Sequence, residues 1–187
     1  MNALLESFED NGDLSRWWLR TIIIVMLLGF AVLLSITVLS YRNAPPIPGK
    51  VVNAQGVTLF TGADISDGQT VFLKYGLMDN GSIWGHGAYL GPDYSADALH
   101  RMGIDTANAL AIAHVGVPFD QLDATQQAGI QAQTAVTLKQ NRYDAATDTL
   151  TLTAAETLAW QQQQGYWAEY FKHPANNGGL KPNLITD

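Results

Sequence analysis

The sequence contains no cysteine among its 187 residues. This absence excludes disulfides, zinc–thiolate sites, iron–sulfur clusters, a cysteine nucleophile and the thioether attachment of a c-type haem. Charged residues are also scarce, at 14% against about 25% in an average soluble domain. The formal net charge is −7, so the chain lacks the excess of basic residues that would neutralise the phosphates of a nucleic acid.

A long apolar run near the N-terminus accounts for much of the low charge. Residues 21–41 contain no charged side chain, and about 20 residues at 1.5 Å each cross the roughly 30 Å hydrocarbon core of a bilayer. The sequence therefore predicts a transmembrane helix over residues 16–42. Its ends carry the aromatic and basic residues typical of membrane interfaces, namely Trp17, Trp18, Tyr41, Arg16, Arg20 and Arg42.

A cleaved signal peptide is the alternative interpretation of this run, with Val38-Leu39-Ser40 as a weak cleavage site. The run is longer than the core of a typical signal peptide, which has about 7–15 apolar residues, so we expect it to remain as an anchor. Basic residues balance on the two sides, Arg16 and Arg20 against Arg42 and Lys50. The positive-inside rule therefore does not set the orientation.

The remaining segments define the domain organisation. Residues 1–15 form an acidic tail, and residues 43–50 (NAPPIPGK) form a proline-rich linker. Residues 51–187 contain mostly helical signals and predict a mainly α domain. Its first expected elements are a hairpin over 51–60, a helix over 67–75 capped by Ser66 with Gln69, and a helix over 95–116 capped by Ser95 and broken at Gly103. A surface helix over 123–141 and a short strand or hairpin over 142–153 follow. The last expected helix begins at a Thr153–Glu156 capping box, continues through Phe171 and is stopped by Pro174.

Candidate reactive side chains are scattered along this domain. The four histidines show no two-ligand spacing for zinc, although a haem held without covalent attachment by His100 or His114 stays open. The aspartates at 64, 67, 93 and 97 lie at expected caps and turns and form no calcium loop. There is no nucleophile elbow, phosphate loop or dinucleotide fingerprint. The residues by themselves therefore indicate no catalytic site.

The stretch 68–94 differs from the rest because it combines glycines with large aromatic residues. Gly87 and Gly91 lie close to Trp84 and Tyr89, a combination typical of backbone packed tightly against a core or a partner. The residues alone leave both interpretations open. The last expected helix carries a second aromatic stripe, for which we favour the core over a partner contact. Its members are Leu158, Trp160, Tyr166, Trp167 and Tyr170.

Three phrases of the sequence carry a family resemblance: YGLMDNGSIWGHGAYLGPD (75–93), NRYDAATDTLTLTAAETLAWQQQQGYWAEYF (141–171) and NGGLKPNLITD (177–187). They resemble the N-terminal region of quinol-dependent nitric-oxide reductases. In that family a membrane helix and a periplasmic domain precede a multi-helix catalytic region with haem b, haem b3 and a non-haem iron. The resemblance implies one N-terminal transmembrane helix followed by a mainly α, cytochrome-c-like domain with short β-hairpins.

The same resemblance implies a location and an orientation. The chain would cross the bacterial inner membrane once, with residues 1–15 in the cytoplasm and residues 51–187 in the periplasm. The periplasmic domain of this family is similar to the small cytochrome c subunit of the two-subunit nitric-oxide reductases. That similarity identifies positions in this chain at which a haem c would be attached.

The haem c site is expected to be lost. Matching Gly85–Tyr89 to the G-E-G-A-Y segment that follows C-x-x-C-H in the small cytochrome c partner places Leu77 and Asn80 at the two cysteines and Gly81 at the haem-ligating histidine. Side chains must then fill the vacated volume, because interiors tolerate few large voids. The lack of haem c implies a membrane quinol, and not a soluble cytochrome, as the electron donor. The expected fillers are Phe72, Tyr75, Trp84 and the aromatic residues of the last helix.

The resemblance further implies a calcium site shared with the catalytic region. In the two-subunit enzymes the matching segment gives mainly backbone oxygens to a calcium ion that bridges the haem propionates and a glutamate of the catalytic subunit. Carried over, the ligand positions here are Gly87 and Tyr89, and His86 stands in place of a glutamate. Calcium accepts such oxygen donors. The alternative is a plain tight turn with a packed tyrosine.

The resemblance thus predicts a non-catalytic part of an enzyme that reduces two NO to N2O. By itself the chain would hold no haem or iron and would be inactive. It would be either a fragment of a longer protein or a small subunit that docks onto a separate catalytic chain. Its expected partners are that catalytic region, the lipid bilayer and, indirectly, the membrane quinol. The alternative function is a free-standing, membrane-anchored binding or assembly module.

Overall fold

A computed structural model describes residues 16–173, 177–182 and 184–186. The chain divides into two compact units, Met1–Pro46 and Ile47–Asp187. The expected cytoplasmic tail, residues 1–15, and the expected helix stop at Pro174 lie outside the described residues.

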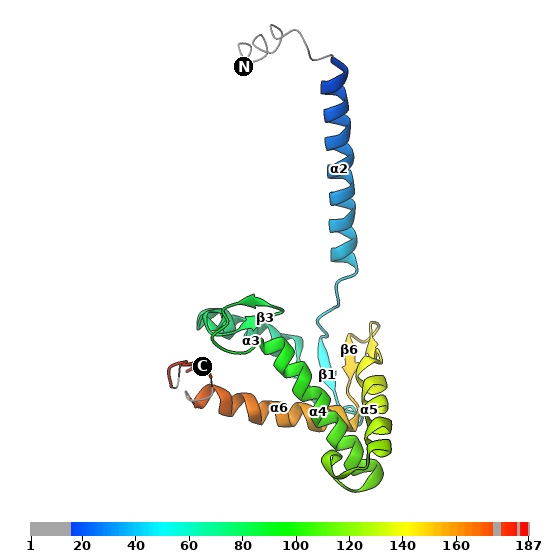
Figure 1. Cartoon of the computed structure of the whole chain (residues 1–187), viewed down its shortest axis with the longest axis vertical. Coiled ribbons are helices and arrows are strands. Elements are labelled where there is room, and N and C mark those ends of the chain that lie inside the picture. The colour runs from blue at the N-terminus through cyan, green and yellow to red at the C-terminus, as the bar shows by residue number, and fades with distance from the viewer. Residues whose placement is uncertain (1–15, 174–176, 183, 187) are drawn as a thin grey trace. The chain divides into compact units, whose positions relative to one another are not determined.

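The first unit contains helix α2 (Arg16–Arg42; Figure 1). Its 27 residues extend about 40 Å at 1.5 Å per residue. Its apolar side chains are exposed on every side, and the hydroxyls of Thr21, Ser35 and Thr37 each donate to the carbonyl four residues earlier at 2.8 Å. A helix that is apolar all round is typical of a membrane span. Among the described residues, α2 is the one helix long and apolar enough to cross a bilayer.

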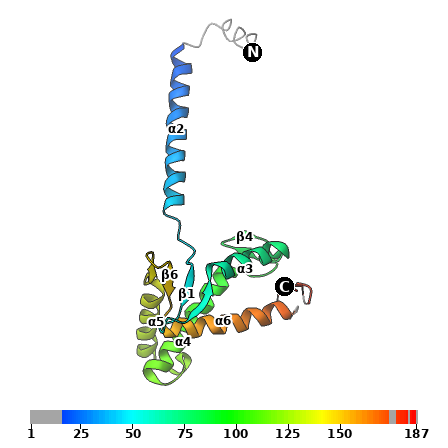
Figure 2. The same cartoon turned by 180° about the vertical axis from the view of Figure 1, so that it is seen from behind.

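The second unit is mainly α, as predicted. Figures 1 and 2 show α6 crossing α4, and α4 packs against both α6 and α5. Two short 3-10 helices lie in the connections. The helices are α3 (Gly62–Lys74), α4 (Tyr94–Val115), α5 (Ala124–Lys139), α6 (Ala154–Lys172), η1 (Leu77–Asp79) and η2 (Phe119–Gln121).

Two small sheets complete the second unit. In the larger sheet, β1–β2 and β5–β6 are antiparallel hairpins at the positions where the sequence predicted them, and β1 also pairs with β6 in parallel, with Val51 opposite Leu150. The parallel pairing joins segments from opposite ends of the unit. The strands are β1 (Lys50–Val52), β2 (Thr58–Thr61), β5 (Tyr143–Asp144) and β6 (Thr149–Thr151), in the order β2-β1-β6-β5, and β3 (Ser82–Ile83) with β4 (His86–Gly87) in the second sheet.

The start of α3 differs from the prediction. The helix begins at Gly62 and not near Asp67, because Thr61 and Asp64 form its capping box. The Asp64 N–H donates to Thr61 Oγ1 (3.3 Å), and the Asp64 carboxylate accepts from the Thr61 N–H (2.7 Å). Ser66, the predicted cap, lies inside the helix, where its hydroxyl donates to the Gly62 carbonyl (3.0 Å).

Helix α4 begins earlier and continues farther than expected. Its N-cap is Asp93, whose carboxylate accepts from the Ala96 N–H at 2.9 Å, so Ser95 is not the cap. Gly103 does not break the helix, because an internal glycine costs about 1 kcal/mol without removing a hydrogen-bonding group. The helix ends before Gly116, whose φ of +86° turns the chain away.

The last two helices begin at capping boxes. Thr153 and Glu156 form the predicted box of α6, and the helix ends at Lys172, one residue beyond the expected Phe171. Helix α5 buries Ile130 and leaves polar side chains outward, as expected of a surface helix.

The apolar core of the unit lies where α4, α5 and α6 meet. Ala111 in α4 and Ala159 in α6 are fully buried, and such small side chains allow two helices to approach closely. The buried members of this core are Ala107, Leu110, Ala111, Leu122, Ile130 and Ala155.

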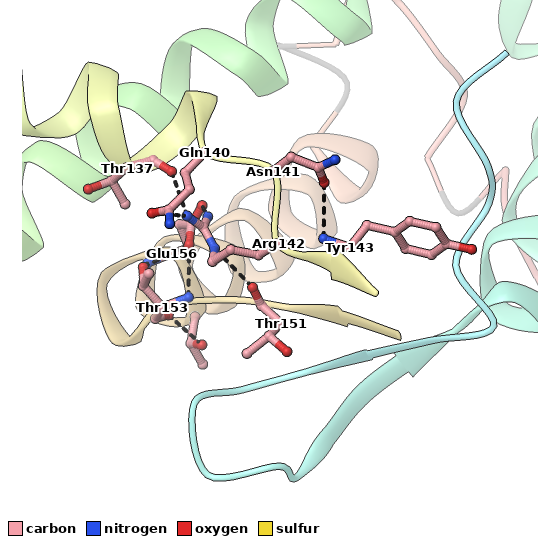
Figure 3. Close-up of polar contacts among 9 residues, drawn as sticks. Thr137, Gln140, Asn141, Arg142, Tyr143, Thr151, Thr153 and Glu156 are labelled. Carbon is pink, nitrogen blue, oxygen red and sulfur yellow. Dashed lines mark hydrogen bonds and ion pairs between the residues drawn. The ribbon is translucent and has the colours of Figure 1, made fainter. Parts of the chain in front are cut away.

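A buried ion pair fastens the ends of three elements (Figure 3). The Arg142 guanidinium pairs with the Glu156 carboxylate at the start of α6, and the two side chains are 16% and 6% exposed. Arg142 also donates to the carbonyls of Thr151 in β6 (3.0 Å) and Thr137 in α5 (2.8 Å). The second Glu156 oxygen accepts from the Thr153 N–H (2.8 Å). This network holds α5, the β5–β6 hairpin and α6 together.

Replacement of Arg142 tests this network. We expect Arg142→Ala to lower the free energy of unfolding by about 3 kcal/mol, because it leaves the Glu156 carboxylate buried without its charged partner. Urea unfolding of the full chain in detergent micelles, followed by circular dichroism, measures the effect. Lys172→Ala removes an exposed ion pair with Glu169 and should leave the midpoint unchanged. Equal effects of the two substitutions would contradict the assignment.

Candidate functional site

The loop of residues 76–93 connects α3 to α4 and contains the residues that the sequence assigned to a site. Gly76, with φ of +60°, turns the chain into η1. The β3–β4 hairpin follows, and its turn residues Trp84 and Gly85 have φ values of +52° and +76°. Asp93 ends the loop as the N-cap of α4. We refer to this segment as the 76–93 loop.

The three positions matched to the haem attachment motif all lie inside the domain. Leu77 is 3% exposed, Asn80 is 4% exposed and Gly81 is buried. A Cβ at Gly81 would lie 2.7 Å from the Tyr94 ring, so no side chain fits there in this conformation, and an imidazole least of all. Because the sequence has no cysteine, these residues do not fit a covalently bound haem c.

Asn80 is the centre of a buried hydrogen-bond network. Its side-chain amide donates to the Asn177 carbonyl (2.8 Å), and its side-chain oxygen accepts from the Tyr94 hydroxyl (2.6 Å). Its own carbonyl accepts from the Gly91 N–H (2.5 Å). Asn177 is fully buried and donates to the Tyr170 carbonyl at the end of α6 (3.1 Å). One side chain thus ties the loop to the start of α4 and to the segment that follows α6.

Aromatic rings surround the hydroxyl partner of Asn80. The Tyr94 ring contacts four others at centroid distances of 5.7–6.2 Å. Burial, and then the neighbouring Tyr170, raise the pKa of Tyr94 far above its ordinary value, so its hydroxyl stays protonated and able to donate. The four rings belong to Phe72, Trp167, Tyr170 and Phe171.

Some of the expected fillers occupy this region and others do not. Phe72, Trp167, Tyr170 and Phe171 pack there. Of the predicted stripe, Tyr170 is buried, Trp160 stacks on Phe60 instead (5.4 Å), and Leu158 is 51% exposed, so the stripe belongs to the core only in part. Trp84 was expected to fill the space and is instead 71% exposed. Tyr75 bonds to Thr186 through its hydroxyl (3.0 Å). An apolar crevice of about 350 Å³ remains beside Leu77 and the aromatic rings.

Asp93 holds the outer half of the loop against α4. One carboxylate oxygen accepts from the Gly85 N–H (2.6 Å) and the Ser82 hydroxyl (2.8 Å), while the other caps α4 at Ala96. The backbone N–H groups of Ala96 and Gly85, and then the Ser82 hydroxyl, hold the pKa of Asp93 below its ordinary value. The carboxylate is therefore ionised at neutral pH and fully engaged within the chain.

The expected calcium positions lie on the outer side of the loop. Gly87 has a φ of +142°, and a Cβ there would lie 2.9 Å from Ser82 Cα, so the chain's own packing requires glycine at this position. The Ala88 N–H donates to the Met78 carbonyl (2.8 Å). Tyr89 is 87% exposed, which does not agree with the alternative of a packed tyrosine.

These two residues could supply only part of the ligands that calcium requires. Calcium takes about six to eight oxygen ligands, and the carbonyls of Gly87 and Tyr89 would supply two. Among the described residues no group of three or more acidic or histidine side chains could hold a metal ion. Water or oxygen atoms of another part of the enzyme would supply the remaining ligands.

The two histidines of α4 lie apart in the structure, and His100 lines an apolar crevice of about 560 Å³ between α4, η2 and α5. His100 and His114 are both exposed on α4, and fourteen residues of helix separate them by about 21 Å. His114 Nε2 lies 3.0 Å from the Gln133 side-chain nitrogen. These two side chains do not face a common iron position.

Sequence reasoning misjudged one residue of this region and missed another. Asp93 was placed among expected caps and turns, but the cap of α4 was assigned to Ser95, and the structure gives that role to Asp93. Asn177 was not singled out at all, and its contact with Asn80 joins residues far apart in the sequence. No local pattern signals such a contact.

The fold and this loop define a cytochrome-c-like helical domain without haem attachment residues. Residues 48–187 match the family model of the NorB cytochrome c-like domain of nitric oxide reductase. The chain therefore belongs to this family, whose members form part of nitric oxide reductase. A search of curated proteins found no match.

Replacement of Asn80 tests the network at the lost haem site. We expect Asn80→Ala to lower the free energy of unfolding by about 2 kcal/mol, because the Tyr94 hydroxyl and the Asn177 carbonyl lose their buried partner. Asn141→Ala is the matched control, since Asn141 is exposed and caps a surface turn at the Tyr143 N–H; it should cost about 0.5 kcal/mol or less. Denaturant unfolding of the full chain compares them, and a loss for Asn80→Ala no larger than the control would refute the central role of Asn80.

Proposed function

We propose that this chain is the membrane-anchored, non-catalytic portion of a quinol-dependent nitric-oxide reductase and that it caps the haem-bearing catalytic region. The match of residues 48–187 to a nitric oxide reductase family carries this proposal. The assembled enzyme combines two NO with two electrons and two protons to give N2O and water. In this reaction the chain would cover the catalytic region and would supply no ligand of the catalytic haem or iron.

The replaced attachment motif supports a quinol as the electron donor. A soluble cytochrome passes electrons through a haem, and Leu77, Asn80 and Gly81 offer neither thioether bonds nor an axial ligand. The rings around Tyr94 and the Asn80 network occupy part of the space beside this motif. Electrons would therefore reach haem b and haem b3 directly from the membrane.

Helix α2 supports the proposed location. Its length and all-round apolar surface suit a single span of the bacterial inner membrane. With the N-terminus in the cytoplasm, the second unit lies in the periplasm. The domain would then stand at the outer side of the catalytic region and contact both that region and, through α2, the lipid.

The outer side of the 76–93 loop supports a shared calcium ion. Gly87 and Tyr89 would each offer a backbone carbonyl, and the exposed position of Tyr89 leaves room for a partner's ligands. Calcium is compatible with carbonyl donors and would offset the negative charge of haem propionates. The ion would thus couple the position of this loop to the haems of the partner.

Isolation of the chain from its native membranes tests the proposed function. A tagged full-length chain should co-isolate with b-type haem and with NO reductase activity that accepts electrons from a quinol. Reduced soluble cytochrome c should support no turnover. Isolation of the chain without haem or activity would contradict the proposal and favour a free-standing module. Turnover with cytochrome c would contradict the assignment of the donor.

A substitution at Gly87 tests the calcium site. In the assembled enzyme, Gly87→Val should lower the ratio of calcium to haem by roughly half or more, because the branched side chain displaces the carbonyl ligands. Tyr89→Phe is the control, since it keeps the backbone carbonyl and the ring, and it should retain calcium. Elemental analysis of the purified enzyme measures the ratio. Full calcium content in Gly87→Val would rule out this segment as a ligand.

A further inference from the structure

Trp84 combines two features that are each unfavourable for an isolated domain. Its φ of +52° lies in the left-handed region, which residues with bulky side chains rarely adopt. Its side chain is 71% exposed, so a large apolar indole faces water. Strained backbone of this kind tends to occur at functional sites. Trp84 therefore calls for an explanation outside the stability of the domain.

The turn geometry makes the choice of tryptophan more unusual. Trp84 and Gly85 link β3 to β4 and both have positive φ, which is the geometry of a type I′ turn. Asparagine and glycine normally fill the two positions of such a turn. Gly85 follows this preference and Trp84 does not. The turn would form more readily with asparagine at position 84.

Hydrogen bonds to the start of α4 hold the backbone of the turn. The Trp84 N–H donates to the Ser95 hydroxyl (3.3 Å), and the Gly85 N–H donates to the Asp93 carboxylate (2.6 Å). Both acceptors belong to the start of α4. The backbone at Trp84 is therefore held in place before a partner binds, so little backbone conformational entropy is lost on binding.

Other apolar side chains of the same loop are also exposed. Tyr89 is 87% exposed, Leu90 is 73% exposed and Met78 is 42% exposed. Binding energy at protein interfaces concentrates in a few side chains, among which tryptophan and tyrosine are enriched. The composition of the loop surface is therefore that of a protein interface.

Charge favours a protein over a lipid surface as the partner. The chain has a net charge of −7, and acidic residues outnumber basic ones in the second unit as well. Anionic lipid headgroups attract basic segments and repel acidic ones. The 76–93 loop contains two acidic residues, Asp79 and Asp93, and no lysine or arginine.

We propose that Trp84 is the anchor side chain through which this domain docks against the haem-bearing region of nitric oxide reductase. This inference rests on the proposed function and adds a specific contact to it. The indole enters a pocket of the partner, and the exposed Leu90 extends the contact. The free energy lost in the turn is recovered only in the assembled enzyme.

Trp84→Asn should change the unfolding midpoint in opposite directions in the chain alone and in the assembled enzyme. In the full chain alone, Trp84→Asn should raise the unfolding midpoint by about 3 °C, because asparagine suits the type I′ turn. In the assembled enzyme, the same substitution should lower the midpoint of the domain. Val136→Gln is the control, because it removes another exposed apolar side chain (69%) on α5; it should not change the difference between the two states.

Hydroxyl-radical footprinting with mass spectrometry locates the contact. Trp84 should be oxidised rapidly in the full chain alone and severalfold more slowly in the assembled enzyme, while Val136 should react equally in both. Quenching of Trp84 fluorescence by brominated lipids, measured against Trp84→Asn, tests for the bilayer instead. No quenching at Trp84 is expected.

The outcomes separate this inference from the proposed function. If the wild-type chain never co-isolates with haem b, the proposed function is wrong and the docking partner with it. If the enzyme assembles but Trp84 stays reactive, or if Trp84→Asn assembles like the wild type, only the docking role is wrong. Quenching of Trp84 by brominated lipid would contradict docking to a protein and show that Trp84 contacts the bilayer. A lower midpoint of Trp84→Asn in the chain alone would show that the indole supports the domain itself.

Discussion

The hydrogen bonds of Asn80 are the constraint on which the second unit depends. In a cytochrome c, the covalent haem ties the attachment loop to the surrounding helices. Here one buried amide joins the loop to Tyr94 in α4 and to Asn177 beyond α6. Because Asn80 and Asn177 are buried and Tyr94 is half-buried, each would lose free energy without its partner. In this domain a small hydrogen-bond network thus links the loop to the helices, as the covalent haem does in a cytochrome c.

The network divides the 76–93 loop into two sides with different roles. On the inner side, Leu77 and Gly81 are buried, and the geometry at Gly81 leaves no space for a Cβ. On the outer side, Trp84 and Tyr89 are exposed, although burial would be favourable for both. The inner side is held together without a covalently attached haem, and the outer side is the surface that we propose as the contact with the rest of nitric oxide reductase.

The sequence predicted helices and hairpins well where the signals are local, and less well where signals compete. Ser66 had capping-box spacing, but Thr61 offered an earlier box at the end of β2 and started α3 there. The parallel pairing of β1 with β6 and the contact of Asn80 with Asn177 join distant segments, which no local pattern reveals. Trp84 was misplaced in the core because the positive φ of its turn is not evident from an aromatic residue.

Hydrogen exchange at Asn80 tests this account most directly. The side-chain amide of Asn80 and the N–H of Gly91 that bonds to its carbonyl can both be followed by NMR of the full chain in micelles. If the network holds the loop, both should exchange nearly as slowly as the buried backbone amides of α4, because they open only with larger unfolding. Exchange as fast as that of the exposed turn at Gln55 would show that the loop is not held through Asn80 and would contradict the account.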